Sequence, residues 1–336
     1  MIDEFSRRTF LKSTAVAVSA AAAVNTAVHA QQNPGAKKEQ TMRLQTVGIM
    51  SPGDMGSAVG QVLSQRGLKV IAALGERSPR TRTLAAQAGI ADVGSLENLV
   101  RQADMVLSIL DPDAAVGAAQ RVADAMKSTG AAPLYVDCNS VSPQSAVKIR
   151  GIMQVVGAPF AEASIIGAPP RGSSNTRFYA SGPQAEAFAQ LAQFGLNVKV
   201  LGPEDGKAKA IKVCYATITK GTQALCTESM VTAQRLGVFG GLMAELEGSQ
   251  PGLLKFAQNG LQQMPPKAHR WIGEMNELAA TYQGVGLTPR MLTGAADLYT
   301  DVGKTALGHE APEAQRTVSR SFEAFIAQLE RELPRA

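Results

Sequence analysis

The stretch GIMSPGDMGSAVG, residues 48–60, decides the fold. It follows the short apolar run at residues 44–47 and precedes a segment whose apolar residues recur at helical spacing. A strand, a glycine-containing turn and a helix, in this order, form the setting in which the motif G-x-G-x-x-G binds a dinucleotide. Here the motif begins at Ser51 and ends at Gly56, so serine replaces the first glycine.

The remaining residues of the loop can still serve a pyrophosphate. Gly53 stands where the backbone must approach the phosphates, and Gly56 allows the helix to pack closely on the strand. Pro52 presets its own backbone angle and Ser51 can bond back to the local backbone, so the turn can form without the first glycine. A turn that serves packing alone remains the alternative. We expect cofactor contacts from Ser51, Pro52, Gly53, Asp54, Met55 and Gly56.

The second predicted strand, residues 69–74, is followed by GERSPRTR, residues 75–82. An acidic residue at this place binds the ribose hydroxyls of NAD, whereas arginine accommodates the 2′-phosphate of NADP. Both kinds are present, but Arg77, Ser78 and Arg80 together offer a charged fork and a hydroxyl to a phosphate. We therefore favour NADP over NAD, and we read Arg82 as a solvated helix residue.

Strands and helices alternate through the first half of the chain. This pattern predicts a Rossmann-type α/β fold with a doubly wound parallel sheet, which binds ligands at the carboxyl ends of its strands. We place this domain at 42–204 and join it by a long interdomain helix, 207–236, to an all-α C-terminal domain at 205–334. Strands are expected at 44–50, 69–74, 104–110, 133–140, 154–158, 177–180 and 198–201. Helices are expected at 54–66, 79–88, 113–126 and 184–194, with a further short helix capped by Ser95.

The first thirty residues have the features of an export signal. SRRTFLK, residues 6–12, precedes an alanine-rich segment and the small residues Val28-His29-Ala30, where a signal peptidase would cut. The segment resembles a twin-arginine signal, which implies the twin-arginine export machinery as a partner and a periplasmic location. It is too short and too rich in alanine for a stable membrane anchor. Residues 31–41 are then a linker. If Met42 is the true start, the protein is cytoplasmic.

Composition excludes several classes of function. The 336 residues carry a formal charge of +5 and only 5% aromatic residues, without a long basic run, so a nucleic-acid binder is disfavoured. The three cysteines and three histidines lack metal-ligand spacing, and we predict no metal site. Cys214 and Cys226 fall on one predicted helix roughly 18 Å apart, too far for a disulfide.

The segments GIMSPGDMG, ERSP, SILDPDAA and VDCNSVSP, in this order, make residues 44–236 similar to the β-hydroxyacid dehydrogenases. That superfamily includes 6-phosphogluconate and 3-hydroxyisobutyrate dehydrogenases and the imine reductases. The serine-containing loop and PPKAHRWIGEMNELAATY, residues 265–282, resemble a subgroup with a phosphogluconate-dehydrogenase-like C-terminal domain. By this resemblance Leu110, Asp111 and Asn139 contact the cofactor at the ends of two strands.

The resemblance also implies a catalytic lysine in the pattern G-x-G-x-x-x-K-x-x-x-N. GKAKAIKVCYA, residues 206–216, places Lys212 on that lysine, with Ala208 at the second glycine and Ala216 at the asparagine. A lysine can take or give a proton at the carbon that exchanges hydride. We expect the like charge of Lys209, one turn earlier, to assist it.

The substrate loop of the family matches EASIIGA, residues 162–168, and has Ile166 in place of a carboxylate-binding serine. Gly167 survives, so backbone amides there can hold an oxyanion. Tyr215 lies beside the lost asparagine, and Trp271 and Glu274 share one face of a predicted helix. We assign all five residues to the substrate site, although a lone tryptophan is often a packing residue.

These features predict an NAD(P)-dependent oxidoreductase that moves hydride to or from a small carbonyl or hydroxy compound. Because the serine and the asparagine are lost, an imine reductase remains an alternative, as does a non-catalytic NADP-binding protein of the periplasm. A homodimer is expected, because apolar residues occur on several faces of the long central helix, namely Ile211, Val213, Ile218, Leu225 and Met230.

Overall fold

A computed structural model describes residues 44–172, 175–310 and 320–334. The predicted export signal, its cleavage site and the linker to residue 41 lie outside the described residues. The described residues belong to one compact unit by their backbone contacts, and the domain boundary after residue 204 stays a prediction.

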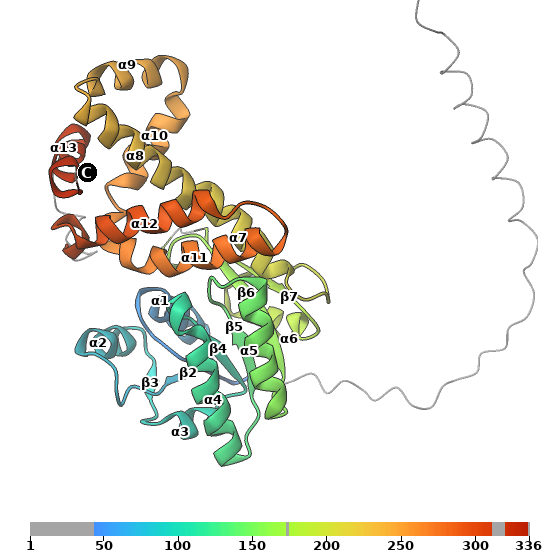
Figure 1. Cartoon of the computed structure of the whole chain (residues 1–336). Coiled ribbons are helices and arrows are strands. Elements are labelled where there is room, and N and C mark those ends of the chain that lie inside the picture. Colours follow the sequence, from blue (N-terminus) through green and yellow to red (C-terminus); the bar gives the residue numbers. More distant parts are fainter. Residues whose placement is uncertain (1–43, 173–174, 311–319, 335–336) are drawn as a thin grey trace, which may run out of the picture. The chain divides into compact units, whose positions relative to one another are not determined.

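One eight-stranded sheet forms the first part of the fold, in the order β3-β2-β1-β4-β5-β6-β7-β8 (Figure 1). All neighbouring strands are parallel except β6 and β7, which are antiparallel. The direction of winding reverses between β1 and β4, and in such sheets the ligand crevice opens at this point. The strands are β1 (Thr46–Ile49), β2 (Lys69–Ala72), β3 (Ala91–Asp92), β4 (Met105–Ser108), β5 (Leu134–Asp137), β6 (Phe160–Ile166), β7 (Arg177–Ser181) and β8 (Asn197–Val200).

Helices cover both faces of the sheet and bury a separate apolar cluster on each. The flanking helices are α1 (Asp54–Gln65), α2 (Pro79–Gln87), α3 (Leu96–Gln102), α4 (Ala115–Thr129), α5 (Pro143–Val155) and α6 (Ala185–Ala189), with the short 3₁₀ turns η1 (Pro112–Ala114) and η2 (Gln190–Phe194). Residues of α1, α2 and α6 share one cluster, and those of α3, α4 and α5 share the other. The predicted Rossmann-type sheet is therefore confirmed.

One expectation in this part was wrong. Residues 154–158, expected as a strand, are the end of α5 and the turn that follows it. Ser142 caps α5 with its hydroxyl and Pro143 occupies its first turn, which is a start signal that the sequence does contain. The strand of this region is β6. Its polar residues Glu162 and Ser164 are buried, and they interrupt the apolar run by which a buried strand is recognised in a sequence.

The remaining described residues are helical. They form α7 (Lys207–Ala216), the π-helical turn η3 (Thr217–Gly221), α8 (Thr222–Arg235), α9 (Phe239–Ser249), α10 (Pro251–Leu261), η4 (Pro265–Lys267), α11 (Ala268–Gly284), α12 (Arg290–Lys304), η5 (Leu307–His309) and α13 (Phe322–Glu332). Their apolar residues bury a third cluster, which includes Tyr299 and Phe325. The single helix expected over 207–236 is thus interrupted by a π turn.

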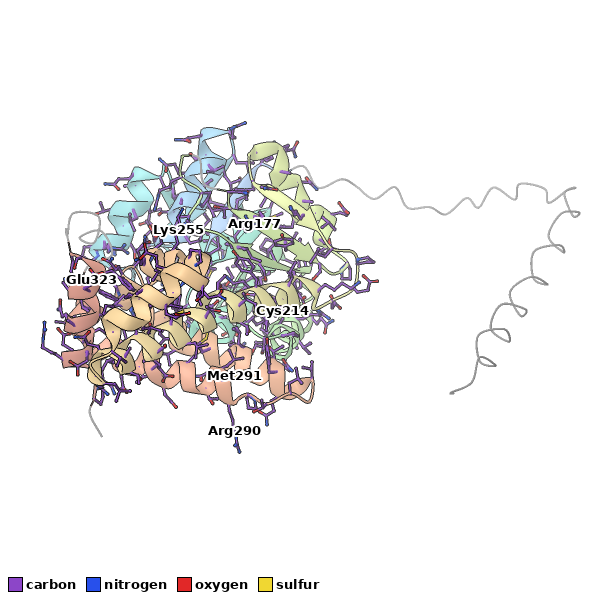
Figure 2. All side chains as sticks on the ribbon, turned by 90° about the horizontal axis from the view of Figure 1, so that it is seen from above. Arg177, Cys214, Lys255, Arg290, Met291 and Glu323 are labelled. Carbon is purple, nitrogen blue, oxygen red and sulfur yellow. The ribbon has the colours of Figure 1, made fainter. Side chains whose placement is uncertain are left out.

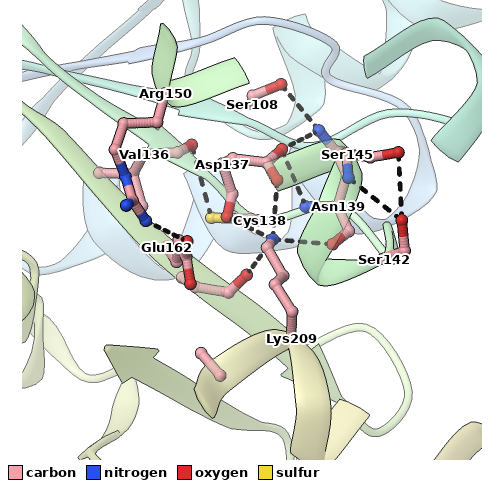
Figure 3. A network of polar contacts seen from close by, with 12 residues as sticks. Ser108, Val136, Asp137, Cys138, Asn139, Ser142, Ser145, Arg150, Glu162 and Lys209 are labelled. Carbon is pink, nitrogen blue, oxygen red and sulfur yellow. Dashed lines mark hydrogen bonds and ion pairs between the residues drawn. The ribbon is translucent and has the colours of Figure 1, made fainter. Parts of the chain in front are cut away.

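A buried lysine attaches α7 to the sheet. Lys209 is fully buried, and its Nζ donates to the carbonyl oxygens of Asp137 (2.9 Å), Asn139 (3.0 Å) and Ala163 (2.7 Å). The Asp137 carboxylate lies 2.7 Å from the same nitrogen (Figure 3). The ammonium therefore joins the end of β5 and the middle of β6 to the helix.

A carboxylate holds the beginning of α7. The buried Glu162 accepts from the backbone N–H of Gly206 at 2.6 Å and pairs with Arg150, whose other nitrogen pairs with Asp205. A negative charge at a helix N-terminus is favourable, because the first N–H groups of the helix lack helical partners. The start of α7 is therefore fixed independently of Lys209.

In the parts of the chain that the structure describes, no helix is long and apolar enough to cross a membrane. The same residues contain no group of histidine, cysteine or acidic side chains that could hold a metal ion. All three cysteines are free.

Replacing Lys209 by methionine will leave the Asp137 carboxylate buried without its cation. We expect Lys209→Met to lower the free energy of unfolding by about 3–5 kcal/mol, the cost of breaking one half of a buried ion pair. Equilibrium urea unfolding measures it, and Lys255→Met, at an exposed position of α10, is the matched control. A loss below about 1 kcal/mol, the size of an exposed ion pair, would contradict the anchoring role.

Candidate functional site

The glycine loop between β1 and α1 has the geometry of a phosphate cradle. Gly53 is the N-cap of α1, and no side chain caps the first amides of the helix. A Cβ on Gly53 would meet nothing within 4 Å, whereas a Cβ on Gly56 would overlap the carbonyl oxygen of Ser51. Gly53 therefore leaves room for a ligand, and Gly56 is required by the turn itself. These residues fit a dinucleotide, whose pyrophosphate would lie against the helix N-terminus.

An arginine that is distant in the sequence contacts this loop. Arg171, in the segment after β6, pairs with the Asp54 carboxylate at 2.7 Å and donates to the Asp54 carbonyl at 3.0 Å. Asp54 places a negative charge in the first turn of α1, where it would repel a phosphate. Arg171 compensates that charge. The sequence analysis missed this residue, because its partner is 117 positions away.

The turn after β2 contains the predicted 2′-phosphate residues. Arg77 donates to the Met50 carbonyl at 2.8 Å, and the Ser78 hydroxyl caps α2 by accepting from the Thr81 amide. Burial lowers the pKa of Arg77, and the guanidinium of Arg121 on α4 adds to this effect, while Glu76 opposes it. The sequence analysis did not single out Arg121.

The other two arginines near this turn are Arg80 and Arg82. Arg82 is exposed, as expected of a solvated helix residue, and it also donates to the carbonyls of Gly75 and Arg77. Arg80 lies at the start of α2 and is exposed.

Asn139 ties the ends of β4 and β5 together. Its side-chain oxygen accepts from the Leu110 amide at 2.7 Å, and its nitrogen donates to Ser108 (2.9 Å) and to the Asp137 carboxylate (2.5 Å). The side chain is buried, so its contribution in this structure is to position the loop that begins at Leu110. Asp111, next in that loop, pairs with Arg270 at 2.8 Å.

Helix α11 crosses these strand ends with one face. Arg270, Glu274 and Glu277 are spaced by four and three residues, so their side chains lie on the same face. They contact Asp111, the Ser140 hydroxyl (2.8 Å) and the Ser142 amide (2.7 Å), respectively. A Cβ on Gly273 would overlap the Asp113 carboxylate, so glycine is needed there for the close approach.

Two lysines, one carboxylate and one hydroxyl form the polar centre beneath α11, which we call the lysine cluster: Lys212, Lys220, Glu274 and Ser140. Glu274 Oε1 lies 3.8 Å from Lys212 Nζ and accepts from the Ser140 hydroxyl, while Oε2 accepts from Lys220 Nζ. Both lysine side chains are about one-sixth exposed, and Glu274 is buried. The sequence predicted Lys212 and Glu274 but missed Lys220.

The charges of this cluster shift its titrations. Burial lowers the pKa of Lys220 to about 8, and Lys212 and Arg270 add to this effect, while Glu274 opposes it. Burial would raise the pKa of Glu274, but the two ammonium groups and its hydrogen bonds outweigh burial and lower it to about 2. Glu274 is therefore a carboxylate, and Lys220 can exchange its proton near neutral pH.

The influence of the Lys209 charge on Lys212 stays a prediction, but Lys209 itself has another partner. Its ammonium faces the sheet, where Asp137 pairs with it. Residues 209 and 212 are three apart, so their Cβ atoms lie on the same side of α7. The two long side chains then end at different partners.

The other predicted substrate residues are dispersed. Trp271 packs edge-on against Tyr299, and Lys220 Nζ lies 4.8 Å from the centre of its indole ring. Ile166 is buried at the end of β6, and Gly167 follows with a φ of +127°, in a tight return next to Thr176. Tyr215 is exposed, and the structure gives it no polar contact with the lysine cluster.

Two parts of the chain match models of known protein families. Residues 46–196 match the model of the NAD binding domain of 6-phosphogluconate dehydrogenase, and residues 233–302 match a domain of unknown function (DUF1932). An uncharacterized 28.5 kDa protein of Methanothermus fervidus is 26% identical over 204 residues, which are 61% of this chain and 77% of that protein.

Two solved structures have similar folds. One is a conserved protein of unknown function, described as structurally similar to 3-hydroxyacid dehydrogenases; it is 28% identical, with 81% of this chain and all of that chain covered and a TM-score of 0.59. The other is 3-hydroxyisobutyrate dehydrogenase of Mycobacterium tuberculosis with L-serine, at 19% identity, 82% and 100% coverage and a TM-score of 0.60.

If Arg171 compensates Asp54 beside the phosphate cradle, the two charges will act oppositely on dinucleotide binding. We expect Arg171→Ala to weaken NADPH binding about fivefold, since an exposed charge at a helix terminus contributes up to about 1 kcal/mol. Asp54→Asn should strengthen binding and should restore most of the affinity when it is combined with Arg171→Ala. Calorimetric titration measures the dissociation constants.

Arg290→Ala is the matched control, because it removes the same charge from an exposed position at the start of α12 (Figure 2). Equal affinity of Arg171→Ala and the unmodified protein would refute a role of this arginine at the cradle.

Proposed function

We propose that the chain is a nicotinamide-dependent oxidoreductase acting on a small carbonyl or hydroxy compound, because residues 46–196 match the model of the NAD binding domain of 6-phosphogluconate dehydrogenase. The observation that supports this best is the place of the lysine cluster. Ser140, at the end of β5, donates to the carboxylate that also binds Lys212 and Lys220. Proton-carrying groups are thus attached directly to the strand ends at which such sheets bind their ligands.

The residues that would hold the cofactor come from three strand ends. The loop Ser51–Gly56 would take the pyrophosphate, Arg77 and Ser78 the 2′-phosphate, and the loop at Leu110 and Asp111 the nicotinamide side. When bound, a nicotinamide dinucleotide supplies or accepts the hydride. Arg77 beside Arg121 supports NADP as the preferred form. Calorimetry with NADPH and NADH on the unmodified protein and on Arg77→Ala tests this preference.

The chain's own chemistry would then be proton transfer. Lys212 exchanges a proton with the oxygen attached to the carbon that gains or loses hydride. Glu274 holds the ammonium form of the lysines close to this point, and Ser140 orients the carboxylate. Arg270 and Glu277 hold helix α11 over the strand ends.

We also propose that two copies associate along α7 and α8. Ile218 and Leu225 are more than two-thirds exposed and Tyr215 is nearly half exposed. Cys214 also points outward from this segment (Figure 2). Val213 and Met230, which were expected to face a partner, are instead buried in the helical core. Sedimentation of the unmodified protein and of Ile218→Asp distinguishes a dimer from a monomer.

Export by the twin-arginine route remains part of the proposal. It rests on Arg7 and Arg8 and on the small residues before Gln31. Because that route carries folded proteins, the cofactor would leave the cytoplasm already bound. Fractionation of cells that express the full chain, with and without Arg7→Lys and Arg8→Lys, tests both location and route, and nicotinamide absorbance of the purified mature protein tests the bound cofactor.

Replacing Lys212 by methionine removes the ammonium and keeps most of the side-chain volume. We expect Lys212→Met to slow NADPH oxidation at least about 100-fold, the usual contribution of an acid–base residue, with cofactor affinity unchanged within about threefold. Single-turnover absorbance with aldehydes, keto acids and cyclic imines measures the rate, and Lys255→Met is the control.

Unchanged turnover of Lys212→Met would refute its role. If the unmodified protein binds NADPH tightly but turns over none of the compounds, a non-catalytic nucleotide-binding protein becomes the better description.

A further inference from the structure

The π turn η3 brings a second lysine into line with Lys212. An uninterrupted α-helix turns about 100° per residue, so side chains eight residues apart would differ by about 80° around the axis. A π turn accommodates one additional residue, and the separation of eight then acts as seven, within about 20° of two full turns. Lys212 and Lys220 therefore reach the same carboxylate, that of Glu274.

The π turn is held in place by a residue from another helix. The Tyr299 hydroxyl, on α12, donates to the Lys220 carbonyl at 2.6 Å, and the Ala224 amide donates to the same hydroxyl. In an α-helix that carbonyl and that amide would bond to each other. A side chain inserted into the helical ladder is a recognised cause of such irregularities. Tyr299 is fully buried and also packs against Trp271. The surrounding structure therefore holds the residue that stabilises the π turn.

The side chain of Lys220 is surrounded by functional groups of the site. Glu274 accepts from its ammonium, the Trp271 ring lies 4.8 Å away, and Lys212 and Arg270 are close enough to affect its titration. Ala216, at the position of the family's asparagine, is buried in the helical core and carries no polar side-chain group. Lys220 stands one turn beyond that position and on the side of the site.

We propose that Lys220 is a second acid–base residue of this site, which contacts the substrate in place of the missing asparagine. The inference rests on the proposed function. In the direction of reduction, the carbonyl carbon accepts hydride from the reduced nicotinamide and the C=O π-bond breaks. Lys212 gives its proton to the resulting oxygen and an O–H bond forms. Lys220 then gives its own proton to the neutral amine of Lys212, and solvent reprotonates Lys220.

Glu274 links the two lysines. Its carboxylate is shared, with Oε2 on Lys220 and Oε1 towards Lys212. When Lys220 loses its proton, the carboxylate remains to stabilise the ammonium of Lys212. The burial that lowers the pKa of Lys220 to about 8 makes its neutral form accessible near neutral pH. The rate of reduction should therefore fall as the pH rises through about 8, where Lys220 loses the proton that it must give.

The decisive comparison is between Lys220→Arg and Lys220→Met. Arginine keeps the positive charge beside Glu274 but cannot lose its proton, whereas methionine removes both. If Lys220 transfers a proton, both variants will slow NADPH oxidation at pH 7 at least about 100-fold and will abolish the pH dependence near 8. NADPH affinity should stay within about threefold of the unmodified protein, and Lys255→Arg and Lys255→Met are the matched controls.

Full activity of Lys220→Arg, within about threefold of the unmodified protein, would overturn the proposal, because Lys220 would then act only as a fixed charge. If the fall in the rate of reduction near pH 8 persists in both variants, the proposal is overturned as well. Circular dichroism and urea unfolding of the variants show whether a slow variant is also misfolded, and in that case the labelling experiment below decides.

A second measurement does not need turnover, so it separates a failure of this inference from a failure of the proposed function. Competitive acetylation of the unmodified protein at a series of pH values, followed by peptide mass spectrometry, reports the titration of each lysine. Lys220 should react with a midpoint near pH 8, and the midpoint should fall further in Glu274→Gln, because the carboxylate raises the pKa of Lys220. A midpoint near the ordinary value of about 10.4 would overturn the inference even if the enzyme turns over NADPH.

Discussion

The structure depends on one buried ammonium group. Lys209 satisfies carbonyls at the end of β5 and in the middle of β6 and neutralises Asp137, whose carboxylate in turn receives a hydrogen bond from Asn139. Asn139 then fixes the loop at Leu110. Removing the charge would therefore loosen both the attachment of α7 and the two strand ends. A buried pair of this kind is a weak source of stability, but it tolerates only one arrangement of its partners.

That attachment sets the rotation of α7 and hence the direction of Lys212. Because Lys209 is held by the sheet, Lys212 must project on the side of the sheet's carboxyl ends, where Ser140 and Glu274 meet it. Because of the π turn, the side chain of Lys220 projects in the same direction as that of Lys212. Two lysines from one helical segment and one carboxylate from another thus converge on strand ends that belong to the sheet. No single one of these segments contains the site.

Sequence patterns predicted the parts of the fold that are locally encoded. The apolar runs and the glycine turn located β1, α1, β2, β4 and β5, and Ser95 marked the start of α3. Strand β6 was missed, because the partners of Glu162 and Ser164 lie elsewhere in the chain and make burial of these polar residues possible. The C-terminal end of α5 was taken for a strand, although Ser142 and Pro143 signal its beginning.

The candidate site was predictable where a residue's role follows from its place in a motif, as for Gly53, Gly56 and Lys212. It was not predictable where the role depends on rotation about a helix axis. Lys209, Lys212 and Lys220 are three lysines of one predicted helix, and the sequence cannot distinguish the one that anchors the sheet from those that face Glu274. The distinction comes from Tyr299, nearly eighty residues later, which opens one helical turn and thereby decides which side chains share a face.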